Sequence, residues 1–153
     1  MSTIYDKEKL SGDDIQDEVF RRMEKYDHKS FLECFSIYLG TAQILEFGLK
    51  KLLEERFNVT EDETERMTLG QARARLENVG LRSDYTELLK QVVKDRNNAA
   101  HELLANQAVI GSLGVDFSQR MQFKDLKHFI FGLERAVFLF DYLQHNNAWV
   151  VDA

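Results

Sequence analysis

The sequence predicts an all-α, single-domain bundle of about five helices over residues 1–153, with its core at about 30–146. Proline is absent from the 153 residues, apolar side chains recur every three to four positions, and no segment shows the alternation of a strand. Apolar residues make up 44% and charged residues 30% of the chain, a composition that excludes intrinsic disorder. The length suits one domain with a sizeable core.

Capping signals predict where the first two helices begin. Ser11, followed by Asp14, marks an N-terminal helix over about 11–27. Ser30, followed by Glu33, marks a second helix that continues to about residue 57. Its inward stripe is expected to consist of Phe35, Tyr38, Leu39, Ala42, Leu45, Leu49, Leu52 and Leu53.

Three further helices follow from the same kind of signal. Thr68, with Gln71, opens a short helix that Gly80 ends. Ser83 caps a helix that continues to about Ala105, and a last helix covers about 123–146. The segments between these helices that we expect to be loops are 58–66 and 106–122.

The net charge of −6 is unevenly distributed along the chain. Residues 1–65 carry a net −7, residues 66–96 a net +3, and residues 97–153 a net −2. The acidic total argues against a general nucleic-acid coat. An anion such as a phosphate is expected at the central positive stretch, because local potential steers a ligand more than total charge does.

The chain is expected to stay in the cytoplasm and to have no membrane partner. No apolar run reaches the roughly 18 residues that a membrane span needs. The first residues lack the apolar core of a secretory signal. The single cysteine, Cys34, cannot form an internal disulfide, which suits a reducing compartment.

The fourth predicted helix carries the residues with chemical potential. At 100° per residue, Lys90, Lys94, Asn97 and His101 form one stripe opposite the apolar side. The two ammonium groups and the amide are suited to phosphate binding, and the imidazole beside them titrates near neutrality. Arg96 lies about 140° away from His101 on the same helix, so a shared site would need the helix to meet its own copy across a twofold axis.

The same stripe has a plainer interpretation. A polar stripe is what any surface helix shows, and exposed lysines commonly serve solubility. With 10 arginines and 4 histidines in the chain, an arginine five positions before a histidine occurs by chance in about a quarter of such sequences. None of the four histidines has another histidine at a metal-ligand spacing, so no metal ligand is predicted.

The run Arg96-Asn97-x-x-x-His101, in a long helix near the end of a short all-helical domain, resembles the HEPN superfamily. Members carry an arginine, an adjacent polar residue and a histidine five to seven positions after the arginine. Glu46, an acid inside the long second helix, and the Thr68-to-Gln71 segment are also similar to the family. The resemblance covers roughly residues 30–143.

The resemblance implies a metal-independent RNA endonuclease that needs no cofactor and acts as a homodimer, with both copies of the arginine and histidine in one cleft. His101 would serve as general base or acid, Arg96 would hold the phosphate, Asn97 would orient substrate or histidine, and Glu46 would fix Arg96. Lys90 and Lys94 would contribute to substrate binding. The expected product is a 2′,3′-cyclic phosphate.

The biological role implied by the resemblance is that of a toxin or a defence effector, with an antitoxin or regulatory protein as a possible partner. A tyrosine that follows the histidine by two positions in some toxins is replaced here by Leu103, so control by modification of that residue is not expected. Many superfamily members are inactive. The alternative is therefore a non-catalytic helical module that dimerises and binds a partner protein or a nucleotide.

Overall fold

The computed structural model describes residues 3–103 and 118–151, and within these ranges the chain is helical with no strand. The all-α prediction is therefore confirmed for the described part. Its six α-helices are α1 (Gly12–Met23), α2 (Phe31–Arg56), α3 (Glu61–Glu65), α4 (Leu69–Asn78), α5 (Ser83–Asn98) and α7 (Ser118–His145). Two 3-10 turns, η1 (Ile4–Asp6) and η2 (Glu24–Tyr26), and a π-helical turn, η3 (Ala99–Leu103), complete the described elements.

Reciprocal capping begins most of these helices, as the sequence predicts. At the start of α2, the backbone N–H of Glu33 donates to Ser30 Oγ at 3.1 Å, and the N–H of Ser30 donates to Glu33 Oε1 at 3.2 Å. The same arrangement occurs at Ser11 and at Thr68. A further box at Thr60 begins α3 inside the segment 58–66 that we expected to be a loop, which explains the sixth helix.

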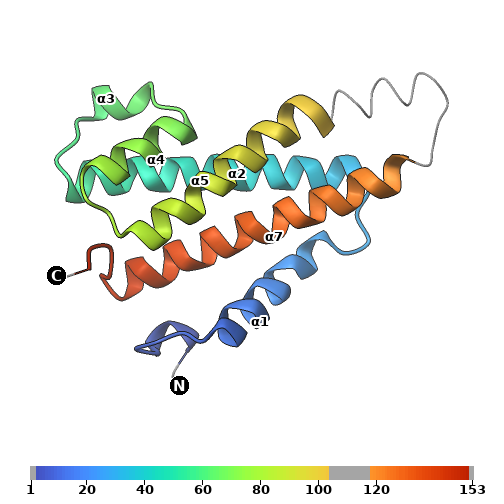
Figure 1. Cartoon of the computed structure of the whole chain (residues 1–153), viewed down its shortest axis with the longest axis horizontal. Helices are drawn as coiled ribbons and strands as arrows, with labels where there is room; N and C mark the ends of the chain where they lie inside the picture. The colour runs from blue at the N-terminus through green and yellow to red at the C-terminus, as the bar shows by residue number, and fades with distance from the viewer. Residues whose placement is uncertain (1–2, 104–117, 152–153) are drawn as a thin grey trace.

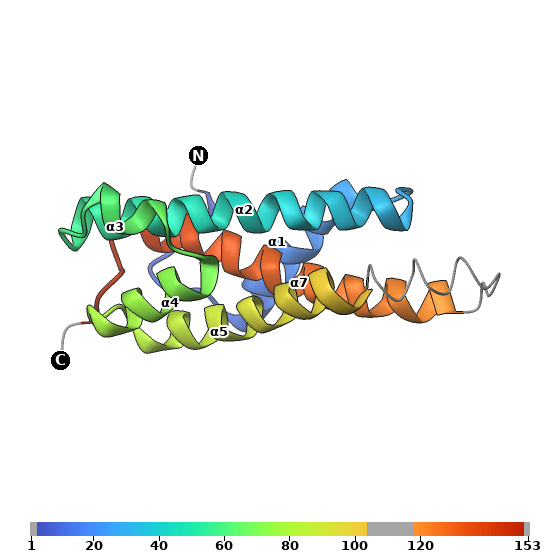
Figure 2. The same ribbon diagram turned by 90° about the horizontal axis from the view of Figure 1, so that it is seen from above.

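Helix α7 lies at the centre of the bundle. It packs against α1, α2 and α5, while α4 packs against both α2 and α5. Figure 2 shows α7 between α2 and α5, which overlap each other in the view of Figure 1. The outer surfaces of α2 and α5 therefore face away from each other.

The buried side chains come from all five of these packed helices, and the inward stripe predicted for α2 is buried or half-buried. Trp149, which follows α7, is 2% exposed and packs edge-on against Phe140 and Tyr85, with ring centroids 5.0 Å and 5.8 Å away. The backbone N–H of Arg82 donates to the Trp149 carbonyl at 3.0 Å. These contacts hold the segment after α7 against the start of α5.

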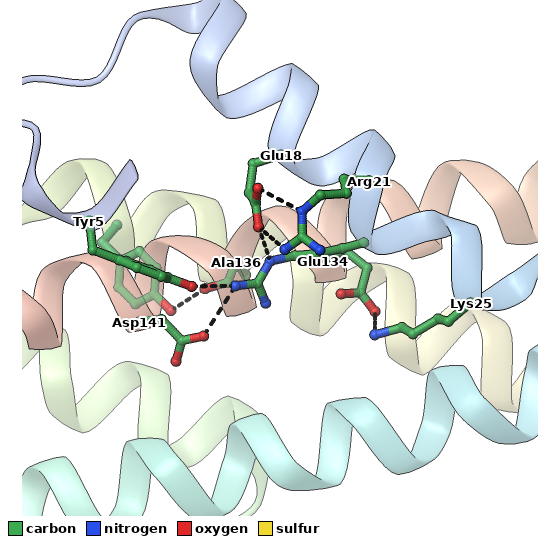
Figure 3. Close-up of polar contacts among 9 residues, drawn as sticks. Tyr5, Glu18, Arg21, Lys25, Glu134, Ala136 and Asp141 are labelled. Carbon is green, nitrogen blue, oxygen red and sulfur yellow. Dashed lines mark hydrogen bonds and ion pairs between the residues drawn. The ribbon is translucent and has the colours of Figure 1, made fainter. Parts of the chain in front are cut away.

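Polar contacts join the N-terminal helices to α7 (Figure 3). Glu134 of α7 is fully buried, and its Oε1 forms an ion pair with Lys25 Nζ at 2.6 Å and accepts a hydrogen bond from the Tyr26 hydroxyl at 3.0 Å. Arg22 Nη2 donates to the Tyr5 hydroxyl at 2.7 Å. A buried carboxylate is tolerated only with such partners, so this pairing fixes where α1 and η2 sit.

Several predicted boundaries need correction. The N-terminal helix expected over 11–27 is α1 followed by the separate turn η2. Ser83 is the first residue within α5 and not its cap, and the α-helix expected to reach Ala105 ends at Asn98, where η3 begins. The last helix begins at Ser118, so residues 118–122 of the predicted loop are helical, and 106–117 lie outside the described residues.

None of the helices in the described ranges combines the length and the apolar character needed to cross a membrane.

Candidate active site at the end of helix α5

Helix α5 presents the two faces that its sequence predicts. Leu89, Val92 and the following Ala99 are at most 2% exposed and point into the core. Lys90, Lys94 and Asn97 are exposed. The second half of the helix therefore offers a polar stripe with two ammonium groups on the surface of the bundle.

His101 lies in η3, where the α-helical hydrogen-bonding pattern gives way to a π turn, and its side chain is exposed. Because π-type hydrogen bonds span five residues instead of four, each residue of such a turn advances by a smaller angle. The turn therefore moves His101 from the position expected on a straight α-helix toward the side of Arg96 and Asn97. The 140° separation expected between Arg96 and His101 is thereby reduced.

Arg96 is half-buried at the edge of the apolar side of α5, as predicted for a long side chain that reaches outward. Its Nη1 donates to the side-chain carbonyl of Asn97 at 3.5 Å, the outer limit of a hydrogen bond. Arg96 forms no ion pair within the described residues.

Sequence reasoning missed Asp95, the residue next to Arg96. Asp95 is 7% exposed, its Oδ1 accepts from Gln91 Nε2 at 2.8 Å, and its Oδ2 lies toward Gly132 of α7. Burial raises the pKa of the nearby Tyr38 hydroxyl well above its usual value, and the charge of Asp95 raises it further while that of Arg96 lowers it. A buried acid thus stands beside the candidate arginine.

The structure gives Glu46 partners other than the arginine that the family resemblance suggests. Glu46 is 7% exposed, accepts a hydrogen bond from Gln43 Nε2 at 2.9 Å and forms an ion pair with Lys50 Nζ at 3.4 Å. No hydrogen bond or ion pair joins Glu46 to Arg96 within residues 3–103 and 118–151. The other candidate residues lie on α5 and η3, whereas Glu46 lies on α2.

Ion pairing neutralises part of the positive charge of residues 66–96. Three arginines of this stretch have acidic partners: Arg73 with Glu77 at 2.9 Å, Arg75 with Glu63 at 3.3 Å and Arg82 with Asp84 at 2.7 Å. Lys90, Lys94 and Arg96 form no ion pair in the described part of the chain, and neither does Arg66 at the end of α3. Three of these four cations lie on α5, the helix that continues into η3 and His101.

The candidate residues of α5 and η3 lie on an open surface, away from two cavities of the bundle. A cavity of about 390 Å³ beside Cys34 and one of about 510 Å³ beside Tyr142 are lined by other residues. Among the residues that the structure describes, no group of three or more histidine, cysteine or acidic side chains is placed to hold a metal ion. The chemistry available here is that of cations and one imidazole.

Comparisons of this chain with protein-family models, with curated proteins and with solved structures found no match.

Proposed function

We propose that this protein is a metal-independent RNA endonuclease of the HEPN type, whose active site forms where two copies pair along α5 and η3. One observation carries the proposal. The Arg96 guanidinium and the Asn97 amide lie one turn before an exposed histidine, on a helix whose cations have no acidic partner in the described residues. The role that follows is that of a prokaryotic toxin or defence effector.

The proposed reaction uses the nucleophile that RNA itself carries. The ribose 2′-oxygen attacks the adjacent phosphorus while the imidazole of His101 takes the 2′-hydroxyl proton, and the bond from phosphorus to the 5′-oxygen breaks. The His101 imidazolium of the second copy gives a proton to that leaving oxygen. The products are a 2′,3′-cyclic phosphate and a 5′-hydroxyl, so no water, metal or cofactor enters the balance.

Arg96 and Asn97 would act on the phosphate and on its position. The guanidinium binds the non-bridging oxygens and stabilises the charge that builds up on them. The Asn97 amide, already at hydrogen-bonding distance from Arg96, orients the guanidinium or the substrate. Lys90 and Lys94 follow the same exposed stripe, about 6 Å apart along the axis, and would bind flanking phosphates.

A pair of copies is needed because a single helix does not bring its own arginine and histidine fully together. The π turn reduces their angular separation, and a twofold axis beside η3 would supply the rest by placing His101 of one copy near Arg96 of the other. The two lysine stripes would repel each other across such an interface. Bound RNA between them neutralises this repulsion and is expected to favour pairing.

The test is cleavage of RNA by the purified chain with EDTA present. Wild type is expected to cut RNA and leave 2′,3′-cyclic phosphate ends, while His101→Ala and Arg96→Ala each lower the rate at least about 100-fold. His128→Ala is the matched control, because His128 is an exposed histidine on α7 outside the proposed site. All variants should keep the wild-type circular dichroism. Absence of cleavage by wild type, or full activity of His101→Ala, would contradict the proposal.

A further inference from the structure

The outer surface of α2 carries large apolar side chains that stay mostly exposed in the described protomer. Ile44 is 71% exposed and Phe47 is 61% exposed, one helical turn apart. Large exposed hydrophobic side chains in a contiguous group mark an interaction surface more often than scattered ones do. Both residues belong to the middle of α2 (Phe31–Arg56), the helix that lies along one side of the bundle in Figure 2.

Gly40 lies on the same surface and has no reason within the protomer to be glycine. A Cβ built at Gly40 meets no atom within 4 Å, whereas one at Gly48 would come within 3.1 Å of Phe140 on α7. Glycine in the interior of a helix destabilises it relative to alanine. Gly40 therefore leaves open space one turn before Ile44, which a neighbouring helix could use for a close approach.

The charges at the two ends of this surface are arranged for an antiparallel copy of the same helix. At 100° per residue, Glu33, Gly40, Ile44, Phe47 and Lys51 fall within about 60° of one another, on the side opposite the core. If a twofold axis crosses the helix pair at residue 42, each residue of one copy faces the residue of the second copy that is equally far from residue 42 in the opposite direction along the chain. Gly40 then faces Ile44 of the second copy, and Glu33 faces Lys51.

A third pair follows from the same axis. Lys29, just before α2, faces Glu55 near the end of the helix, and both are exposed. No two like charges face each other at these positions, and at the centre Ile44 of one copy faces Gly40 of the other. A parallel arrangement would instead place Ile44 against Ile44 and Lys51 against Lys51.

We infer that the outer face of α2 binds a second copy of this chain in an antiparallel, twofold-symmetric helix pair centred on Gly40 and Ile44. The 26-residue helix is about 39 Å long and a helix is about 10 Å wide, so the contact buries about 400 Å² on each copy. The total of about 800 Å² is below the range of stable specific interfaces and corresponds to weak, transient association. The pair is therefore a reversible dimer that forms at micromolar concentration.

This interface is independent of the proposed nuclease site. The outer faces of α2 and α5 lie on opposite sides of α7, so pairing through α2 does not bring the two copies of His101 together (Figure 2). The inference rests on the exposure, the glycine and the charges of α2 alone. Loss of α2 pairing therefore leaves RNA cleavage unchanged, and loss of cleavage leaves α2 pairing unchanged.

Sedimentation velocity of the full chain over a concentration series tests the surface. Wild type should change its mass at micromolar concentration, and Ile44→Glu should raise the dissociation constant of this step at least about 100-fold while keeping the helicity. Val151→Glu is the control, because Val151 is 64% exposed but lies after α7. If Ile44→Glu assembles like wild type, or if Val151→Glu assembles as poorly as Ile44→Glu, the inference is wrong.

Gly40→Ala separates pairing from folding. Alanine should raise the melting temperature, because the position is in a helix interior with open space around it. It should also raise the dissociation constant about tenfold, because the added methyl stands where Ile44 of the second copy packs. A variant that is more stable and assembles equally well would show that nothing approaches Gly40.

A crosslinking experiment tests the antiparallel register. Glu33→Cys and Lys51→Cys chains are mixed and treated with a short bismaleimide, while the native Cys34 is 1% exposed and protected. The mixture should give a crosslinked dimer, and each variant alone should give little, because identical positions lie about 27 Å apart along the axis. A crosslink with Lys51→Cys alone would indicate a parallel pair, and a monomeric mixture would indicate that something else covers the surface. Either result overturns the inference.

Discussion

Asp95 and Arg96 are neighbours in the chain, yet α5 turns the first into the core and leaves the second at the edge. Asp95 lies 60° from the core direction set by Val92, so its burial is consistent with the helical wheel that also predicts the exposed stripe. Arg96 lies about 40° from the same direction and is nevertheless less buried, so the wheel alone does not explain the difference. Gln91, four residues before Asp95 on the same helix, is the partner that helical spacing places beside the carboxylate. Partners on one helix thus follow from periodicity, whereas the degree of burial depends on packing between helices.

Glu46 on α2 is a second buried acid whose burial and partners can be compared with the sequence. Its position in a long helix suggests an internal acid, and it is buried. Lys50, four residues later on the same helix, is the ion-pair partner that helical spacing offers. The sequence analysis did not predict that Glu46 would be buried, and no hydrogen bond or ion pair joins Glu46 to Arg96 within the described residues.

Two buried tyrosines give a stability prediction at this scale. The hydroxyl of Tyr38 is buried with no hydrogen-bond partner among the described residues, whereas that of Tyr26 donates to Glu134 at 3.0 Å. Tyr38→Phe should therefore raise the free energy of unfolding by about 1 kcal/mol, and Tyr26→Phe should lower it by about 1–3 kcal/mol. Urea unfolding measures both. A loss of stability in Tyr38→Phe as large as that in Tyr26→Phe would show that the Tyr38 hydroxyl has a partner.

At the scale of elements, capping chemistry predicts helix starts better than helix ends. Boxes at Ser11, Ser30 and Thr68 were found where expected, because three residues suffice to encode them. The π turn after Asn98 has no comparable local signal, and it places His101 differently from a straight helix. The start of α7 at Ser118 was missed because residues 106–122 lack a clear apolar period.

The capping carboxylates predict how the helices respond to acid. Backbone N–H donation from Ser11, together with Lys7, lowers the pKa of Asp14 from 3.8 to about 2, and similar donation lowers the pKa of Glu33 and Glu63. A lowered folded-state pKa means that the stabilisation is present above the unfolded-state pKa and is lost as the pH falls through the folded-state value. Stability should therefore decrease between about pH 4 and pH 2.

Asp14→Asn isolates the part of this pH dependence that belongs to α1. The substitution should flatten the decrease in unfolding midpoint over that range, measured by circular dichroism in urea. Asp13→Asn removes the same formal charge from the same helical turn, but Asp13 accepts no hydrogen bond in the described residues, so its profile should match wild type. Identical profiles for the two variants would show that capping does not cause the acid sensitivity.

At the scale of the whole molecule, composition and periodicity predicted an all-α chain and most of its helices. They did not predict that α7 would occupy the centre or that α2 and α5 would present separate outer faces. Those features depend on contacts between segments far apart in the chain. The two faces have opposite character. Helix α5 and the turn η3 carry an imidazole and cations that form no ion pair among the described residues, whereas α2 carries apolar side chains between opposite charges.

Mixing active and inactive copies tests the central proposal, a cleft that needs His101 from two chains. Wild type and His101→Ala are combined in equal amounts at constant total concentration and allowed to exchange, and RNA cleavage is measured in EDTA. If both imidazoles are required, only dimers of two wild-type copies cut, so the rate falls to about a quarter of the wild-type rate. A rate of about one half would show that each chain works alone and would contradict the composite site, as would a wild type that does not cleave RNA.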